Sequence, residues 1–160
     1  MIEVKAPHDY SAHKQGRFSV FLAGSIEMGK AERWQDEIVR RMEGHDILIL
    51  NPRRSEWNSS WEQKTGNISF REQVEWELDA LEAVDIIVFY FDPTTKSPIT
   101  LLELGLHAGR TPEKLVVCCA DGFWRKGNVD ITCEKYGVKQ VDTLDDVIAT
   151  ILATGLKQAA

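Results

Sequence analysis

Short runs of apolar residues alternate along this sequence with longer segments in which apolar side chains recur every third or fourth position. The runs favour strands, and the run at 86–90 is nearly all apolar, which is typical of a strand buried on both faces of a sheet. They predict five strands, at residues 18–22, 46–50, 86–90, 115–119 and 138–141. The amphipathic segments between them predict helices at residues 31–42, 69–83, 98–107 and 144–151.

Residues that favour helix starts stand where three of these helices are expected to begin. Ser69 and Glu72 form a Ser-x-x-Glu pattern, which predicts a capping box. Ser97 followed by Pro98 predicts an N-cap with Pro at the first helical position. Thr143 is expected to cap the last helix.

Strands separated by helices imply right-handed crossovers and a parallel sheet with helices on both faces. The predicted fold class is therefore α/β, a single-domain sandwich of the flavodoxin-like or Rossmann-like kind. Its five parallel strands are expected in the order 2-1-3-4-5, numbered along the chain. We predict a polar N-terminal arm at residues 1–16, the α/β domain at 17–153 and a C-terminal tail at 154–160. Ligands of such sheets bind at the carboxyl ends of the strands.

Composition narrows the class of function. The chain has 160 residues, 43% of them hydrophobic and 28% charged, which suits one soluble domain. A net charge of −6 disfavours nucleic acid as a partner. No apolar stretch approaches the ~20 residues that cross a bilayer, and the first residues are polar, so we expect no membrane association and a cytoplasmic location. The three cysteines and four histidines lack the spacing of a metal site or disulfide framework.

Two glutamates interrupt apolar patterns. Glu77 falls in the middle of the expected buried stripe of the helix at 69–83, and Glu103 flanks that of the helix at 98–107. The two stripes consist of Phe70, Val74, Leu78 and Leu81, and of Ile99, Leu102 and Leu106. A charged group among apolar side chains costs several kcal/mol unless it is paired or solvated. Each glutamate could pair with an arginine, or the helix face could be misjudged. Two such residues near one sheet edge favour a polar cleft.

Two carboxyl groups that face one cleft are the catalytic groups that glycosyl transfer requires. One attacks the anomeric carbon and forms a covalent ester, while the other manages the proton of the leaving group. Glu103 and Glu77 are therefore the candidate catalytic residues.

Several loop residues are candidates for substrate binding, each with a purely structural alternative. The turn Ala23-Gly24-Ser25 lets the backbone approach a ligand, or simply joins a strand to a helix; it matches neither the dinucleotide fingerprint nor the P-loop. The long loop at 51–61 suggests a functional flap.

Within that loop, Trp57 and Trp61 could stack on a base or anchor the loop. Arg53 and Arg54 could meet a phosphate or lie in solvent.

Two more polar residues stand near predicted strand ends. Asp92 either binds sugar hydroxyls or makes an Asx turn before Pro93. Asn128 either binds a ligand or caps a helix.

Three segments of the sequence resemble the nucleoside 2-deoxyribosyltransferase family, as a divergent branch, over roughly residues 17 to 152. They are Phe21-Leu-Ala-Gly-Ser-Ile26, the acidic helix before Val84-Asp85-Ile-Ile-Val88, and Ile99-Thr-Leu-Leu-Glu-Leu-Gly105. The resemblance implies that Glu103 is the nucleophile and that Glu77 is the acid of the preceding helix. It also implies that Asn128 reaches the sugar in a neighbouring subunit, so that the protein is at least a dimer.

The sequence departs from the family pattern at two places. The first predicted strand, 18–22, lacks the tyrosine that orients the nucleophile in well-known members. Ser97, itself a candidate for substrate binding, stands where they have an aspartate shortly before the nucleophile, a role that Asp92 could take.

The resemblance implies exchange of the base of a 2′-deoxynucleoside by a retaining, ping-pong reaction. Its partners are nucleosides and free nucleobases, and it needs no cofactor because the N-glycosidic bond supplies the energy. Two alternatives stay open. One is a hydrolase of 2′-deoxynucleoside 5′-monophosphates, with Ser25, Arg53 and Arg54 around the phosphate. The other is a catalytically silent nucleotide-binding module.

Overall fold

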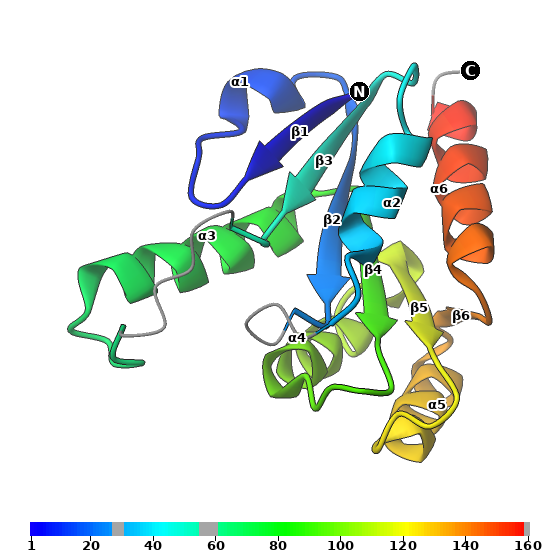
Figure 1. Cartoon of the computed structure of the whole chain (residues 1–160). Coiled ribbons are helices and arrows are strands. Elements are labelled where there is room, and N and C mark those ends of the chain that lie inside the picture. The colour runs from blue at the N-terminus through cyan, green and yellow to red at the C-terminus, as the bar shows by residue number, and fades with distance from the viewer. Residues whose placement is uncertain (27–30, 55–60, 159–160) are drawn as a thin grey trace.

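A single all-parallel sheet forms the centre of the molecule (Figure 1). The computed structural model describes residues 1–26, 31–54 and 61–158. The sheet order is β1-β3-β2-β4-β5-β6. The strands are β1 (Ile2–Lys5), β2 (Phe18–Gly24), β3 (Ile47–Asn51), β4 (Ile86–Phe91), β5 (Leu115–Cys119) and β6 (Lys139–Val141).

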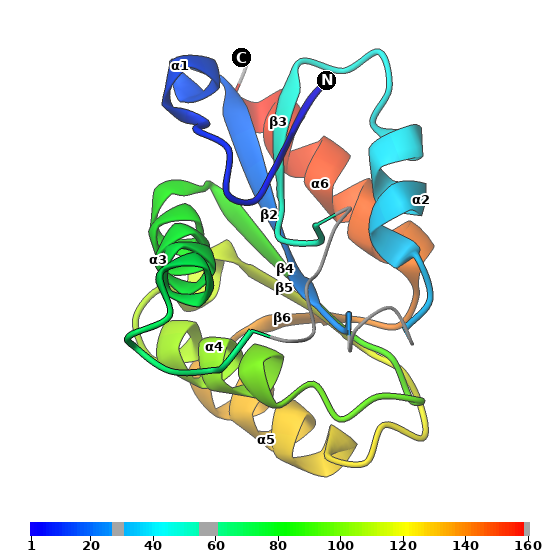
Figure 2. The same cartoon turned by 60° about the vertical axis from the view of Figure 1, so that its left-hand side comes forward.

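Helices cover both faces of this sheet, as Figure 2 shows. They are α1 (Ser11–Lys14), α2 (Trp34–Arg41), α3 (Ile68–Ala83), α4 (Pro98–Ala108), α5 (Lys126–Tyr136) and α6 (Leu144–Gln158). Helices α3, α4 and α5 pack on one face, and α2 and α6 pack on the other. No helix in the described part of the chain is both long and apolar enough to span a membrane.

The inner strands β2 to β5 are almost wholly apolar because both of their faces are covered. In β2, Phe21 and Ala23 point toward α3, α4 and α5, whereas Val20 and Leu22 point toward α2 and α6. Such alternation divides the core into two layers, one on each side of the sheet. Because all the strands are parallel, the polar side chains at their carboxyl ends lie at a single edge of the sheet.

The α/β class and the relative order of the five predicted strands are confirmed, since β3-β2-β4-β5-β6 is the order expected. The strand count was wrong, because β1 adds a sixth strand beside β3, with Ile2 paired to Leu48. Only Val4 of β1 is buried. An edge strand needs few apolar residues, so this polar stretch was taken for an arm.

The helices also differ in part from expectation. Helix α5 was anticipated only through the possible cap at Asn128, and its range was not predicted, because it buries only Val129 and Cys133. Helix α6 continues to Gln158, so most of the segment expected as a tail is helical.

The three predicted helix caps had different outcomes. The capping box at Ser69 was wrong: α3 begins at Ile68, and the Phe70 amide donates to Oδ1 of Asn67 (3.2 Å). The cap at Thr143 is confirmed, since the Asp146 amide donates to its hydroxyl oxygen (3.1 Å). Ser97 holds the N-cap position of α4, but its side chain makes no capping hydrogen bond.

Candidate active site

Helix α4 places Glu103 against the interior of the protein. Glu103 is only 8% exposed, beside buried Leu104 and Ala108 of the same helix. The apolar stripe expected to be buried instead faces solvent, with exposed fractions of 59% for Ile99, 69% for Leu102 and 40% for Leu106. The prediction of that face was wrong because α4 carries a second apolar row, Leu101, Leu104 and Ala108, and this row packs on the core.

Helix α3 brings Glu77 toward the same layer. Its buried residues are Gln73, Trp76, Ala80 and Leu81, so the expected stripe was only partly correct: Leu81 is buried, but Leu78 is exposed. The large indole of Trp76 packs on the core, so the buried face of α3 is centred on a different row of residues from the predicted stripe. Glu77 lies at the border of the true buried face, one turn after Gln73.

The two glutamates interact electrostatically, and α3 and α4 lie side by side on one face of the sheet (Figures 1 and 2). Burial raises the pKa of Glu103 to about 8, and the negative charge of Glu77 adds to the rise. Burial also raises the pKa of Glu77 to about 7. With these pKa values the two carboxyl groups hold more than one proton between them at pH 7, and a singly protonated pair becomes common as pH rises through this range.

Neither carboxyl group forms an ion pair with a residue that the structure describes. The charge of Arg54 lowers the pKa of Glu77, but it only partly offsets the effect of burial. The Glu103 carboxyl group takes no hydrogen bond from the described residues. Buried Glu103 and partly exposed Glu77 thus keep raised pKa values without an ion pair in the described chain, which is a feature of many functional sites.

A series of hydrogen bonds connects Glu77 to the segment that follows β3. The Gln73 amide donates to Oε1 of Glu77 (2.6 Å) and to the carbonyl oxygen of Pro52 (3.2 Å). Nε of Arg54 donates to the side-chain oxygen of Gln73. The segment that follows β3 is thus connected to α3 next to the carboxyl pair.

Three buried hydroxyl groups gather where β2 and β4 end. Oγ of Ser25 lies 2.7 Å from Oγ of Ser97, and the Thr95 hydroxyl lies 2.8 Å from both. Ser97 has φ of 46°, the only positive φ at a non-glycine position in the described chain. Such a conformation costs roughly 1–3 kcal/mol and is common at functional sites.

Gly24 allows this end of β2 to approach its neighbours. A Cβ atom at Gly24 would lie 2.5 Å from the Trp34 ring and 2.6 Å from the carbonyl oxygen of Tyr90. The Ser25 amide donates to that same carbonyl oxygen (3.0 Å). The Ala23 side chain is packed in the core, so only its backbone could meet a ligand.

Asp92 forms the Asx turn that was one of its two expected roles. Its Oδ1 accepts from the amide (2.8 Å) and hydroxyl (2.6 Å) of Thr94, and its Oδ2 accepts from the Glu32 amide (3.1 Å). These bonds lower the pKa of Asp92 and oppose the effect of its burial. The side chain thus ties the loop after β4 to the start of α2.

The side chains of Arg53 and Arg54 have different partners. Nη1 of Arg53 donates to the side chain of Gln35 (3.2 Å) on the α2 side, whereas Arg54 contacts Gln73 on the α3 side. The Arg54 guanidinium also lies 5.0 Å from the centre of the Trp61 ring. Trp57 lies outside the residues that the structure describes.

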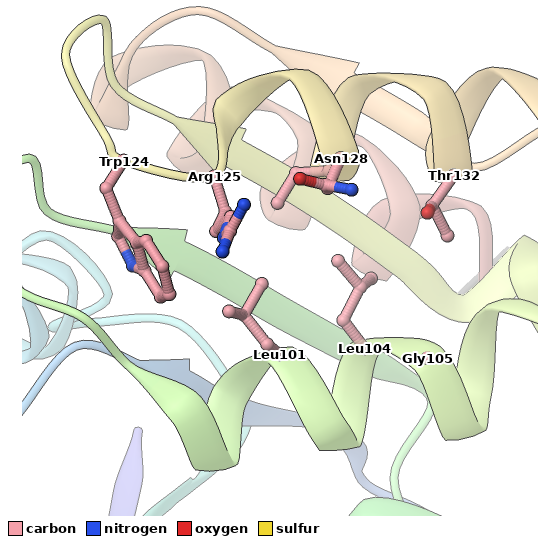
Figure 3. Close-up of a pocket in the computed structure, with 8 residues that line it drawn as sticks. Leu101, Leu104, Gly105, Trp124, Arg125, Asn128 and Thr132 are labelled. Carbon is pink, nitrogen blue, oxygen red and sulfur yellow. The ribbon is translucent and has the colours of Figure 1, made fainter.

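Asn128 lines a groove of about 320 Å³ between α4 and α5 (Figure 3). It faces Leu101, Leu104 and Gly105, and it lies in the first turn of α5, where Arg125 rather than Asn128 holds the N-cap position. Glu103 does not line this groove. At 100° per residue, Glu103 lies about 200° around α4 from Leu101. Within one chain, Asn128 and Glu103 are therefore on different sides of α4.

Two residues near these groups escaped the sequence interpretation. Gln73 would have been found if Trp76 had been used to set the face of α3, because it then falls on the buried side. Thr95 sits in a polar loop that gives no signal of burial. Among the described residues, no group of three or more His, Cys, Asp or Glu side chains is placed to hold a metal ion.

Comparison with known proteins supports one family. No curated protein matches the sequence significantly. The fold is similar to a crystal structure from Enterococcus faecalis described as a conserved protein, with a TM-score of 0.61 and 14% sequence identity, covering 86% of this chain and 99% of that one. The profile of the family described as nucleoside 2-deoxyribosyltransferase like matches residues 17–123, more than half of the chain, including β2, both glutamates and the hydroxyl cluster. The chain therefore belongs to the nucleoside 2-deoxyribosyltransferase-like family.

Proposed function

We propose that this protein exchanges the base of a 2′-deoxynucleoside through a covalent deoxyribosyl ester on Glu103. The observation that carries this function is the neighbouring carboxyl groups of partly buried Glu77 and buried Glu103, which form no ion pair in the described chain and have pKa values of about 7 and about 8. When one of two such groups is protonated and the other is ionised, the pair supplies an acid and a nucleophile at the same pH. Family membership points to the same chemistry.

In the first half-reaction, the Glu103 carboxylate attacks C1′ and the C1′–N bond breaks. The bonding electrons leave with the base, which takes a proton from the Glu77 carboxyl group. In the second half-reaction, a different base attacks C1′ from the opposite face, the ester bond breaks, and Glu77 recovers a proton. Two inversions give net retention.

The state of the pair that reacts has its proton on Glu77 and its negative charge on Glu103. The higher pKa of Glu103 places a single proton mainly on that residue, so the reacting state requires the proton to move to Glu77, and the small difference between the two pKa values keeps the free-energy cost of this move low. The Arg54 charge and the Gln73 hydrogen bond both weaken the hold of Glu77 on its proton. Glu77 is therefore suited to give up a proton during the attack.

A chromatographic exchange assay tests this function. 2′-Deoxyadenosine is incubated with cytosine, and we expect 2′-deoxycytidine and adenine in equal amounts. The Glu103→Ala variant should lose exchange, whereas Glu113→Ala, which removes an exposed glutamate, should retain it. Full exchange by Glu103→Ala would remove the proposed nucleophile.

A second arm replaces the donor with 2′-deoxyadenosine 5′-monophosphate and omits the acceptor base. Release of adenine to water from the monophosphate, without exchange of the nucleoside, would instead indicate the hydrolase. Binding of either donor without cleavage would indicate a silent binding module. The divergence of Arg53 and Arg54 gives the hydrolase less support than the carboxyl pair gives the transferase.

We further propose that the active form is a homo-oligomer in which Asn128 completes a neighbour's site. Within one chain the α5 groove and Glu103 are on different sides of α4. Ile99, Leu102 and Leu106 expose an apolar row on the same helix. Exposed apolar patches of this kind commonly mark protein interfaces, and a second copy on this row could bring its own Asn128 to Glu103.

A further inference from the structure

Gln73 is buried beside the carboxyl pair, with an exposed fraction of only 3%. Its side chain has three polar neighbours: Arg54, the carbonyl oxygen of Pro52 and Oε1 of Glu77. Two of these come from the segment after β3, and the third lies one helical turn further along α3. A buried amide with three partners is held in one orientation.

The partners determine which end of the amide faces Glu77. The Arg54 guanidinium can only donate, so it must face the amide oxygen. The Pro52 carbonyl oxygen can only accept, so it must face the amide nitrogen. The same nitrogen lies 2.6 Å from Oε1 of Glu77. Gln73 can therefore only donate to Glu77.

We infer that Gln73 is a positioning residue that fixes Glu77 by occupying Oε1, so that the transferable proton resides on Oε2. This inference rests on the proposed function, and it adds the group that orients the acid. An oxygen that already accepts a short hydrogen bond is the poorer site for a proton. Oε2 takes no hydrogen bond from the described residues, so a proton there is free to pass to a leaving base.

Arg54 supports this arrangement from the far side of the amide. By holding the Gln73 oxygen it prevents the amide from turning over, and its charge favours the ionised form of Glu77. The other charged groups near this array are Glu103 on α4 and Glu72, whose charge acts on Arg54. Gln73 and Arg54 therefore both favour release of the proton by Glu77, whereas Glu103 opposes it.

The experiment replaces Gln73 with Met, which has a similar length but no donor. Gln63→Met is the matched control, since Gln63 is exposed in the loop before α3. The Glu77 carboxyl group is titrated by ¹³C NMR with labelled glutamate, its signal assigned from the Glu77→Gln variant. Removing a donor to the charged form should raise the Glu77 midpoint in Gln73→Met and leave it unchanged in Gln63→Met.

Kinetics should change in parallel. We expect kcat for base exchange to fall about 10- to 100-fold in Gln73→Met with little change in KM, since a misoriented acid affects the chemical step more than binding. The pH profile should move toward higher pH by the shift seen in the titration. Gln73→Glu is a second variant that keeps a partner for Arg54; it should raise the Glu77 midpoint further, because a carboxylate replaces the donor.

The outcomes separate this inference from the proposed function. If the wild-type protein exchanges bases but the Glu77 midpoint and the pH profile stay unchanged in both Gln73 variants, the positioning role is overturned. If the wild-type protein exchanges no base, the proposed function fails, and the catalytic role of Gln73 fails with it. A raised midpoint together with the fall in kcat supports the inference.

Discussion

Glu103 and Glu77 occupy positions that are unfavourable for isolated carboxylates. Burial raises the pKa of both groups, and no arginine or lysine in the described chain forms an ion pair with either one. A glutamate retained there for stability alone would normally have a cationic partner. The price of this arrangement should therefore be visible as a dependence of stability on pH.

Glu103→Gln should stabilise the protein at high pH. The pKa of Glu103 is about 8 in the folded chain, against an ordinary value of 4.5. The folded state thus holds more protons than the unfolded state between these values, and stability falls as pH rises through this window. Because a buried carboxylate costs several kcal/mol and each kcal/mol is about 2–4 °C for a domain of this size, we expect the variant to melt about 4 °C or more above wild type at pH 9.

Near pH 4 the melting temperatures of Glu103→Gln and wild type should converge, since Glu103 is then protonated in the folded state. Thermal unfolding followed by circular dichroism at both pH values measures the difference. Glu113→Gln, at an exposed position, should show no such dependence on pH. A gain of equal size at pH 4 and pH 9 would contradict the burial of an ionisable Glu103.

At the scale of elements, the strands were readily predicted and the helix faces were not. The strands β2 to β5 are almost wholly apolar, so their positions follow from composition, and their order is the one typical of flavodoxin-like sheets. On α4, the row through Leu102 is as apolar as the row through Leu104. Periodicity cannot decide which row packs on a sheet, because that depends on neighbouring elements.

For the same reason, only part of the candidate site could be predicted from the sequence. Glu77 and Glu103 stood out as charges within apolar segments, and their pairing follows once α3 and α4 are neighbours. Gln73 and Thr95 became apparent only from the packing around them. A polar residue that is buried by a tertiary contact carries no mark of burial in its own segment.

The close contact at the end of β2 gives a prediction at this scale. In Gly24→Ala the new methyl group would lie 2.5 Å from Trp34 and 2.6 Å from the Tyr90 carbonyl oxygen. Overpacking of this kind costs typically about 1–3 kcal/mol. We expect that loss in the free energy of unfolding, measured with urea.

Gly127→Ala on α5 is the matched control, because a Cβ atom there meets nothing within 4 Å. Replacing a helical glycine by alanine should raise the free energy of unfolding by about 0.5–1 kcal/mol. Equal effects of the two substitutions would show that the β2 end has room for a side chain.

For the whole molecule, the exposed row on α4 raises the question of what covers it. If a second copy does, Leu102→Glu should give a smaller particle by light scattering and should lose base exchange, because a charge would enter an apolar interface. Leu156→Glu is the control: Leu156 is 72% exposed on α6, on the opposite face of the sheet, and we expect no change in size. A wild-type protein that is monomeric while active would contradict the oligomer.

Mixing two inactive variants tests whether the site is shared. Glu103→Ala and Asn128→Ala should each lose most exchange activity when assembled alone. Mixed dimers contain one site with both residues intact, so equal coexpression should restore about a quarter of wild-type activity if subunits pair at random around a two-fold axis. No restoration would mean that Asn128 does not act on a neighbour's Glu103.

The most direct measurement concerns the bond itself. The protein is incubated with 2′-deoxyadenosine without an acceptor, quenched in acid, digested and analysed by peptide mass spectrometry. We predict a mass increase of one deoxyribosyl unit on the peptide that carries Glu103, lost when an acceptor base is added before the quench and absent from Glu103→Gln. Active exchange by the wild-type protein with this modification on another residue, or on none, would contradict the account.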